Sequence, residues 1–204
     1  MKTSSRALAF LIYCCSFVVG GVLMGFEMLG SRYLFPYFGG GIGTWASLIS
    51  TVLCALAIGY FAGSAMVARY PSPRTIATAI LIAAAYLALV PGTADGVMSQ
   101  IMDSIGDGPS ATLIASTALL LVPLTLLGTF SPIAVSLLTR SAEEAGRIAG
   151  LVYGVSTIGN VVGTLLTTFV LIPTIGSRAI TYIFALTLAL CAGVLFLPAA
   201  RRRS

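Results

Sequence analysis

The residues of this chain that could do chemistry are few, because only 8% of its 204 residues are charged and none is histidine. Glu27 is the only acid within a long apolar stretch, where an ionisable group is costly and marks a functional candidate. We expect Glu27 near the outer end of its helix, partly buried, just before a helix break at Gly30. Arg32 is its nearest basic partner. The two residues predict either an ion pair that fixes the adjoining loop, or a carboxylate that binds a cationic solute or a coupling proton.

A second set of polar residues recurs at helical spacing further along the chain. Intervals of three and four residues place these side chains within roughly 80° of one another on one helix face. The set consists of Tyr153, Ser156, Asn160, Thr164 and Thr167. This stripe predicts either the polar wall of a solute path or hydrogen bonds to a neighbouring helix. Asn160 is its costliest member to bury.

No constellation for catalysis or metal binding accompanies these residues. Without histidine, the chain lacks the commonest acid–base catalyst and the commonest metal ligand. The four cysteines lie within apolar stretches, where thiols are usually packing residues, so we expect neither a disulfide nor a metal site. They are Cys14, Cys15, Cys54 and Cys191. We therefore predict no enzyme activity, no cofactor and no metal.

The elements that must position these residues are long apolar stretches. About 20 apolar residues match the roughly 30 Å hydrocarbon core of a bilayer, and soluble domains carry roughly three times as much charge. The sequence predicts an all-α integral membrane protein, one domain over residues 1–204. Its helices are expected at approximately 7–29, 43–67, 74–91, 111–138, 147–172 and 178–198. The first is too long for the core of a signal peptide and is expected to be retained.

The placement of the basic residues predicts the orientation. With a cytoplasmic N-terminus, nine of the eleven basic residues fall on the cytoplasmic side: Lys2, Arg6, Arg69, Arg74, Arg140, Arg147, Arg201, Arg202 and Arg203. Arg32 and Arg178 fall outside, as do three aspartates, Asp95, Asp103 and Asp107. This positive-inside bias predicts that both termini are cytoplasmic. The bias accounts for the net charge of +5, so nucleic-acid binding is not needed to explain that charge. On the cytoplasmic side, Arg201–Arg203 could contact anionic lipids.

Glycine and proline indicate how the helices bend and meet. The dense Gly, Asp and Pro content of residues 92–110 predicts a solvated outer loop, and Pro73 is expected to open the third helix. Pro123 and Pro132 should kink the fourth helix, either to line a cavity with freed carbonyls or simply for packing.

Small residues at four-residue spacing let helix backbones approach closely in lipid. Such pairs are Gly21/Gly25, Gly59/Gly63, Gly150/Gly154 and Gly159/Gly163. In the fifth helix the two pairs point roughly 140° apart, counting 100° per residue. This helix is therefore predicted to be wedged between neighbours on two sides.

Several separated motifs, covering nearly the whole chain apart from residues 92–110, are familiar as a set. They are Glu27–Gly39, Thr44–Ile49, Leu56–Gly63, Leu127–Val135, Gly146–Leu165 and Leu171–Gly176. In this order the motifs resemble the membrane domain of bacterial fused major-facilitator/spermidine-synthase-like proteins. The resemblance implies a six-helix half of the major-facilitator fold in the bacterial inner membrane. It also implies a synthase-like Rossmann domain on the cytoplasmic side.

Two departures from that family pattern bear on function. The chain stops at Ser204 without a glycine-rich nucleotide loop, so we expect the synthase domain to be absent and aminopropyl transfer to be lacking. Ala68 stands where the family carries an aspartate before Arg69, so the charged gating motif, of which Arg69 and Arg74 remain, is incomplete.

Two functions remain open from the sequence. The first is a transporter-like module for a small cationic, polyamine-like solute, working with a separate synthase-like partner or as a homodimer. In this hypothesis Glu27 attracts the solute, and Asn160 and Tyr153 line its path. The second is a non-transporting accessory or scaffold subunit of a larger membrane complex.

Overall fold

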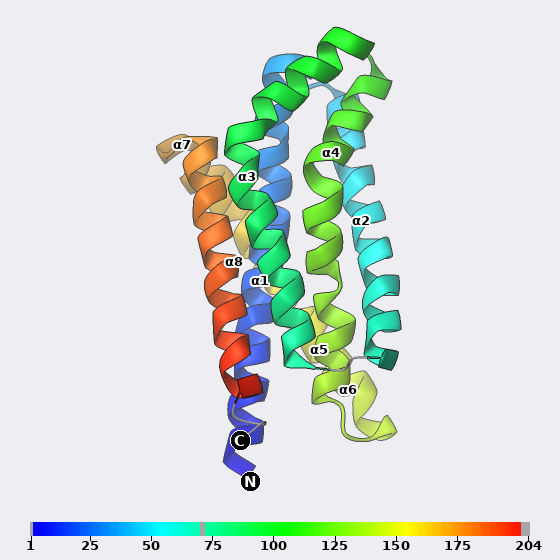
Figure 1. Ribbon diagram of the computed structural model, residues 1–204, viewed down its shortest axis with the longest axis vertical. Helices are drawn as coiled ribbons and strands as arrows, with labels where there is room; N and C mark the ends of the chain where they lie inside the picture. The colour runs from blue at the N-terminus through cyan, green and yellow to red at the C-terminus, as the bar shows by residue number, and fades with distance from the viewer. Residues whose placement is uncertain (1, 70–71, 201–204) are drawn as a thin grey trace.

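The structure, a computed structural model, describes residues 2–69 and 72–200 as a bundle of long helices (Figure 1). Four membrane-length helices are uninterrupted: α1 (Lys2–Phe38), α2 (Ile42–Arg69), α3 (Pro73–Ile105) and α8 (Ser177–Ala200). The fourth transmembrane unit is divided into α4 (Pro109–Gly128) and α5 (Phe130–Leu138). The fifth comprises α6 (Ala142–Leu166), the π-helical segment η1 (Thr167–Leu171) and the short α7 (Ile172–Thr174).

Six helical spans in the described part of the chain are long and apolar enough to cross a membrane. They are Arg6–Phe38, Ile42–Arg69, Pro73–Ile105, Pro109–Leu138, Ala142–Thr174 and Ser177–Phe196. No strand occurs among the described residues. The predicted all-α class is confirmed, and the chain has the make-up of a multi-pass, membrane-embedded protein.

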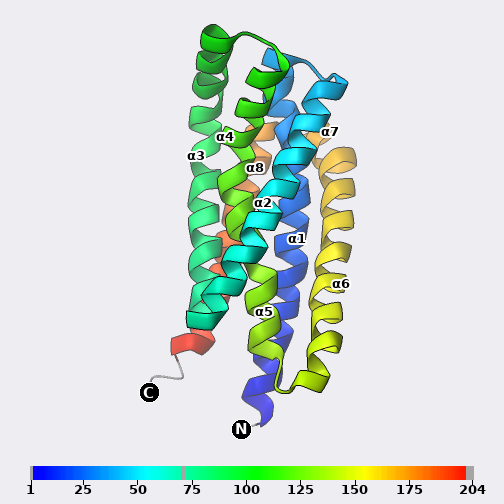
Figure 2. The same cartoon turned by 90° about the vertical axis from the view of Figure 1, so that its right-hand side faces the viewer.

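The bundle has two distinct ends. Helix α1 begins and α8 ends at the same end, where α2 also ends, α3 begins and α5 connects to α6; we name it the terminal end (Figures 1 and 2). The opposite end, here the loop end, holds the α1–α2 and α3–α4 turns. Arg178 and Asp95 form an ion pair that joins α8 to α3 there. This contact agrees with the predicted placement of both residues on one side.

Helix α1 occupies the centre of the bundle. Its residues contact α2, α3, α4, α5, α6, η1 and α8, and the most extensive contacts in the fold pair α1 with α6, α2 with α4, and α3 with α8. Fully buried side chains along α1, such as Ile12, Phe26 and Leu34, build much of the apolar core. Because α1 touches every other long helix, a polar group on its buried face sits inside the protein rather than in lipid.

Helix α1 is longer than the sequence predicted. The expected break at Gly30 is wrong: the helix continues through Pro36 to Phe38 and ends at Gly39, whose φ of 70° suits glycine. Gly30 serves packing instead, since a Cβ there would lie 3.0 Å from Leu48 Cδ2. Tight packing against α2 therefore accounts for this glycine within the helix.

Helix α3 is also longer than predicted. The expected outer loop at 92–110 is wrong, because α3 continues past Pro91 to Ile105 and only residues 106–108 separate it from α4. Ala94 and Met98 are buried and extend the core-facing stripe of α3 at helical spacing. Neighbouring helices can compensate a proline inside a membrane helix, so Pro91 does not end it. The helix stops at Gly106, with φ at 90°.

The junction between α4 and α5 shows what one proline does. Helix α4 ends at Gly128 and α5 begins at Phe130, so the fourth unit is interrupted four residues before Pro132, whose missing N–H leaves the Gly128 carbonyl without its helical donor. Pro123 lies inside α4 without a break. At the third helix, Pro73 stands at the first helical position after the capping Ser72, as predicted.

Candidate functional site

Glu27 is buried near the middle of the protein. The side chain is 4% exposed, and its Oε2 atom has no hydrogen-bond partner in the structure. Glu27 lies five residues past Val22, the middle residue of the span Arg6–Phe38, or about 8 Å along the axis. The expectation of partial burial near the outer end is wrong, because α1 extends eleven residues beyond Glu27.

The neighbours of Glu27 follow from the antiparallel packing of α1 on α2. Gly30, three residues later on the adjoining face, meets Leu48 of α2 and Leu120 of α4. One turn back along α1 corresponds to one turn forward along α2, which places Thr51 at the level of Glu27. Thr51 is also buried, with a hydroxyl that lacks a partner. The region around this α1–α2–α4 junction thus contains two buried side-chain oxygens, on Glu27 and Thr51, whose hydrogen-bonding capacity is unused.

Arg32 does not serve Glu27. Its side chain is exposed, whereas Glu27 is enclosed, and the two form no ion pair within the described part of the chain. The two residues are five positions apart on one continuous helix, so they point roughly 140° away from each other. The predicted Glu27–Arg32 ion pair depended on a break at Gly30 and is wrong for this reason.

The polar stripe on α6 faces α1 along a tightly packed seam. With its amide nitrogen turned toward α1, Asn160 donates to the carbonyl of Gly20 at 2.8 Å and to the carbonyl of Ser156 at 3.3 Å. Ser16 donates to the carbonyl of Val152 at 3.0 Å across the same seam. These bonds are of the interhelical packing kind. Asn160 and Ser156 remain half-buried, so one side of the seam is open.

The remaining members of the stripe differ in their surroundings. Thr164 donates to the carbonyl of Asn160 at 2.8 Å within its own helix. Thr167 is 1% exposed at the start of η1, where it faces Gly25 of α1, and its hydroxyl has no partner. The hydroxyl of Thr168 is equally unpaired. A π-helical turn often accompanies function, and no feature of the sequence indicated this one.

Tyr153 links the stripe to α2. The residue is 40% exposed, and its ring meets the ring of Tyr60 edge to face, with centroids 6.2 Å apart. Because the two tyrosines come from α6 and α2, the pair spans the side of the bundle where α1 lies between these helices (Figure 2). Tyr60 lies within the motif Leu56–Gly63, but the sequence did not predict it as a site residue. A contact between helices that are distant in sequence leaves no local signal.

The glycine pairs divide into packed and unpacked sets. A Cβ at Gly163 would lie 2.5 Å from Gly21 Cα, and a Cβ at Gly59 would lie 2.9 Å from Gly128 Cα. Gly63 and Gly159 are equally tight against α4–α5 and α1. A Cβ at Gly150 or Gly154 would meet nothing within 4 Å. The predicted wedge is therefore wrong in this chain, because α6 packs closely on one side only.

The two arginines of the predicted gating loop lie at the terminal end. Arg69 is exposed in the last turn of α2, and Arg74 follows the cap of α3. Arg74 lines a cavity of about 500 Å³ together with Met66 and Leu126. The guanidinium group of Arg74 thus lies beside a space between α2, α3 and α4. Lys2 and Arg201–Arg203 belong to the predicted basic set, but their side chains lie outside the described part.

Two cysteines meet in the core, which the sequence did not indicate. Cys15 of α1 and Cys191 of α8 are both buried, and their sulfur atoms are 3.4 Å apart. Cys14 and Cys54 are exposed. Cysteines separated by 176 residues carry no pairing signal in the sequence, so this contact could come only from the packing of the first and last helices.

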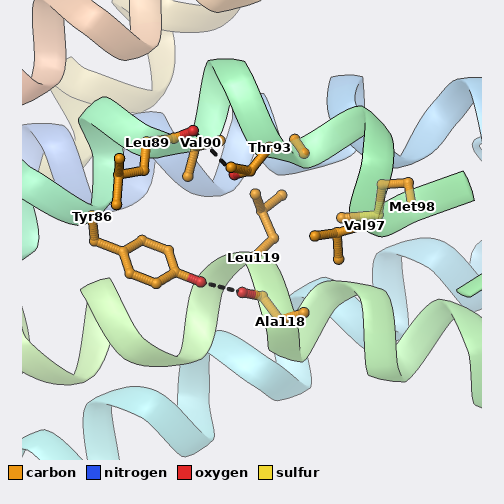
Figure 3. A pocket seen from close by; sticks show the side chains of 9 residues that line it. Tyr86, Leu89, Val90, Thr93, Val97, Met98, Ala118 and Leu119 are labelled. Carbon is orange, nitrogen blue, oxygen red and sulfur yellow. Dashed lines mark hydrogen bonds between the residues drawn. The ribbon is translucent and has the colours of Figure 1, made fainter. Parts of the chain in front are cut away.

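A small cavity of about 150 Å³ lies between α3 and α4 (Figure 3). Its lining is mainly apolar, and its two hydroxyl groups already have partners. Tyr86 reaches across to donate to the carbonyl of Ala118, and Thr93 donates to the carbonyl of Leu89 at 3.0 Å. This cavity therefore offers apolar contact and no free polar group from these side chains. Near the α1–α2–α4 junction, by contrast, Glu27 and Thr51 each have an oxygen without a hydrogen-bond partner.

No protein-family model, curated protein or solved structure matches this chain. The likeness to fused major-facilitator/spermidine-synthase-like proteins accordingly stays a prediction from the motifs. Among the described residues, no cluster of three or more potential metal ligands occurs. The structural features that bear on function are Glu27, the α1–α6 seam and the open side of the bundle.

Proposed function

We propose that this chain is a transporter-like membrane module for a small cationic solute, and that Glu27 is its binding carboxylate. The observation that carries the proposal is the buried Oε2 atom of Glu27, which has no hydrogen-bond partner and lies well inside a helix long enough to span a membrane. An isolated carboxylate in a low-dielectric interior is costly unless it meets a cation or takes up a proton. Binding of a cation and uptake of a proton would each neutralise the carboxylate of Glu27.

The architecture supports a module that moves a solute. Helices α2 and α6 are the least buried spans, with 28% and 17% of their most apolar windows inside the protein. They flank the partly open α1–α6 seam, where Ser156, Asn160 and Tyr153 line the accessible side. The motifs further suggest half of a major-facilitator fold, in which a second copy or another six-helix unit would face this side. Under this proposal a polyamine-like solute passes between the two halves.

The same proposal places the molecule in the cell. The chain would lie in a bacterial inner membrane with the terminal end in the cytoplasm, where Arg69 and Arg74 are the remaining residues of the incomplete gating motif. A synthase-like soluble protein would be its partner at that end. Co-purification under mild conditions, followed by mass spectrometry, tests this partner directly.

Flux measurements test the role of Glu27. Purified protein in liposomes is loaded on one side with labelled spermidine, and uptake by the native protein is compared with Glu27→Gln. Loss of the charge should lower uptake about tenfold or more, because a partly desolvated ionic contact exceeds about 1.4 kcal/mol. Glu143→Gln is the control, since Glu143 is exposed in the first turn of α6. Equal uptake by all three proteins would exclude Glu27 as the binding carboxylate.

A second candidate function is an accessory subunit of a larger membrane complex. The observation that favours it is the unpacked pair Gly150/Gly154, which would let another transmembrane helix approach α6 closely. Native purification distinguishes the two functions. A fixed stoichiometry with unrelated membrane proteins, together with no flux of spermidine above empty liposomes, would support the accessory role.

A further inference from the structure

A basic pocket at the terminal end has no part in the proposed transport path. This arginine pocket has a volume of about 340 Å³, within the range of small-ligand sites. Three elements bound it: the start of α1 supplies Arg6, the α5–α6 connection supplies Arg140, and the start of α6 supplies Arg147. Figure 2 shows these three segments side by side at the lower end of the bundle. Residues far apart in sequence thus bring three guanidinium groups to one cavity.

The charge of the arginine pocket is unbalanced. Glu144 is the only acid in its lining, against three arginines. Within the described part of the chain, Arg6 and Arg147 have no hydrogen bond or ion pair. Guanidinium groups present planar forks of N–H donors that match the oxygens of a phosphate in a bidentate manner. The single carboxylate of Glu144 does not balance the charge of three guanidinium groups. The pocket is therefore suited to binding an additional oxyanion.

The depth of the pocket matches the boundary of a bilayer. Arg6 lies sixteen residues, or about 24 Å, from Val22 at the middle of its span, beyond the roughly 15 Å half-thickness of the hydrocarbon core. Tyr13 lies nine residues, or about 14 Å, from the same point, at the edge of that core. With the middle of this span at the bilayer midplane, the Arg6 end of the pocket lies at the outer edge of the headgroup region, and the Tyr13 end lies at the edge of the hydrocarbon core.

The apolar wall of the pocket is formed by Leu8, Leu138, Ile148 and Tyr13, of which Leu8 and Ile148 are buried. A soluble anion would gain nothing from these side chains, whereas the glycerol and first methylene groups of a lipid would pack on them. We propose that the arginine pocket binds a phosphate group carried by an anionic membrane lipid. This site is separate from Glu27 and does not depend on transport.

The test uses the full chain in detergent, titrated with phosphatidylglycerol and observed by native mass spectrometry. The native protein should retain phosphatidylglycerol in preference to zwitterionic phosphatidylcholine. The double variant Arg6→Gln/Arg147→Gln should lose about tenfold or more of this retention, since two charge-assisted contacts are removed. Equal retention of phosphatidylglycerol by the native and double-variant proteins would overturn the proposal. So would equal affinity of the native protein for the two lipids.

A matched control separates the pocket from general surface charge. Arg69→Gln removes a guanidinium group from the same end of the bundle but from outside the lining, and it should retain phosphatidylglycerol within about twofold of the native protein. A tenfold loss in this control would show that charge at this end, and not the pocket, holds the lipid. Circular dichroism of each variant confirms that its helices are intact before titration.

The same phosphate chemistry could come from a free ion, and a second arm distinguishes the sources. Excess inorganic phosphate is added to the native protein saturated with phosphatidylglycerol. Retention of the lipid supports the lipid headgroup as the ligand, because only the lipid also contacts the apolar wall. Complete displacement by inorganic phosphate, with a phosphate adduct that the double variant lacks, would overturn the lipid assignment.

Discussion

Two polar residues of the bundle, the half-buried Asn160 and the buried Glu27, differ in whether their side chains have hydrogen-bond partners. The amide of Asn160 gives its hydrogens to the carbonyls of Gly20 and Ser156, so it helps to hold α6 on α1. Glu27 has an Oε2 atom with no such partner. Each unsatisfied polar group costs several kcal/mol in a membrane interior. In the proposed function, a cationic solute or a proton would supply the missing partner of this Glu27 oxygen.

Two glycines of α6 make a prediction at the same scale. Gly163→Ala should destabilise the protein by roughly 1–3 kcal/mol, because its Cβ would overlap the backbone of Gly21 and force α6 away from α1. Gly150→Ala is the matched control on the same helix, with nothing within 4 Å of its Cβ. It should be neutral, or stabilising by up to about 1 kcal/mol from helix propensity. Thermal unfolding in detergent, followed by circular dichroism, measures both.

The outcome separates packing from propensity. A lower midpoint for Gly163→Ala alone would confirm the close α1–α6 seam. Equal midpoints for the two variants would contradict it, since both substitutions gain the same helix propensity. The exposed Arg178–Asp95 ion pair contributes less to the stability of the folded protein than the α1–α6 seam does, because exposed ion pairs contribute about 0–1 kcal/mol.

At the scale of elements, the sequence predicted which stretches are helices more reliably than where they end. Helix α2, expected at 43–67, runs from Ile42 to Arg69, within two residues of the prediction at each end. Helices α1 and α3 extend beyond Gly30 and Pro91, where glycine and proline indicated termination. Both residues are enclosed by neighbouring helices, and such packing overrides local propensity. That information is absent from any single segment.

The pairing of α1 with α8 gives a prediction of its own. Treatment with a membrane-permeant thiol oxidant such as diamide should join Cys15 and Cys191, since their sulfur atoms are 3.4 Å apart and a small shift reaches the disulfide distance of about 2 Å. Each thiol gives up its hydrogen to diamide, which is reduced to the hydrazine as the S–S bond forms. Intact mass should fall by the two hydrogens, and two thiols should no longer be alkylated.

Neighbouring cysteines supply the controls for this cross-link. Cys14→Ser should form the bond as readily as the native chain, because Cys14 is exposed on another face of α1. Cys15→Ala should abolish it. A cross-link that persists in Cys15→Ala and disappears in Cys14→Ser would mean that α1 is rotated by one residue relative to α8.

For the molecule as a whole, some features can be predicted from local sequence, and others depend on contacts between distant residues. The six spans and the charge difference between the two ends follow from composition, which is local and additive. The candidate site required three-dimensional packing. Glu27 was found from the sequence as the one acid in an apolar stretch, whereas Thr51 and Tyr60 became relevant only when α2 lay beside α1 and α6. The incorrect pairing of Glu27 with Arg32 came from treating neighbours in sequence as neighbours in space.

The distribution of charge over the whole bundle predicts its orientation. Five described arginines, Arg6, Arg69, Arg74, Arg140 and Arg147, lie at the terminal end, against Arg32 and Arg178 at the loop end. The terminal end should therefore face the cytoplasm. In a background with its four cysteines replaced by alanine, single cysteines at Gly41 and Ser141 report on the two ends. Both positions are exposed in connections between helices.

An impermeant maleimide should label Gly41→Cys in intact cells, and Ser141→Cys only after the cells are permeabilised. Labelling of both in intact cells would contradict a membrane between the two ends. The opposite labelling pattern would mean that the terminal end faces the outside. A solute from outside would then reach Glu27 along a longer path. At 1.5 Å per residue, Glu27 lies about 32 Å from Arg6 and about 17 Å from Phe38 along α1. The orientation thus determines which solution supplies the cation proposed to bind Glu27.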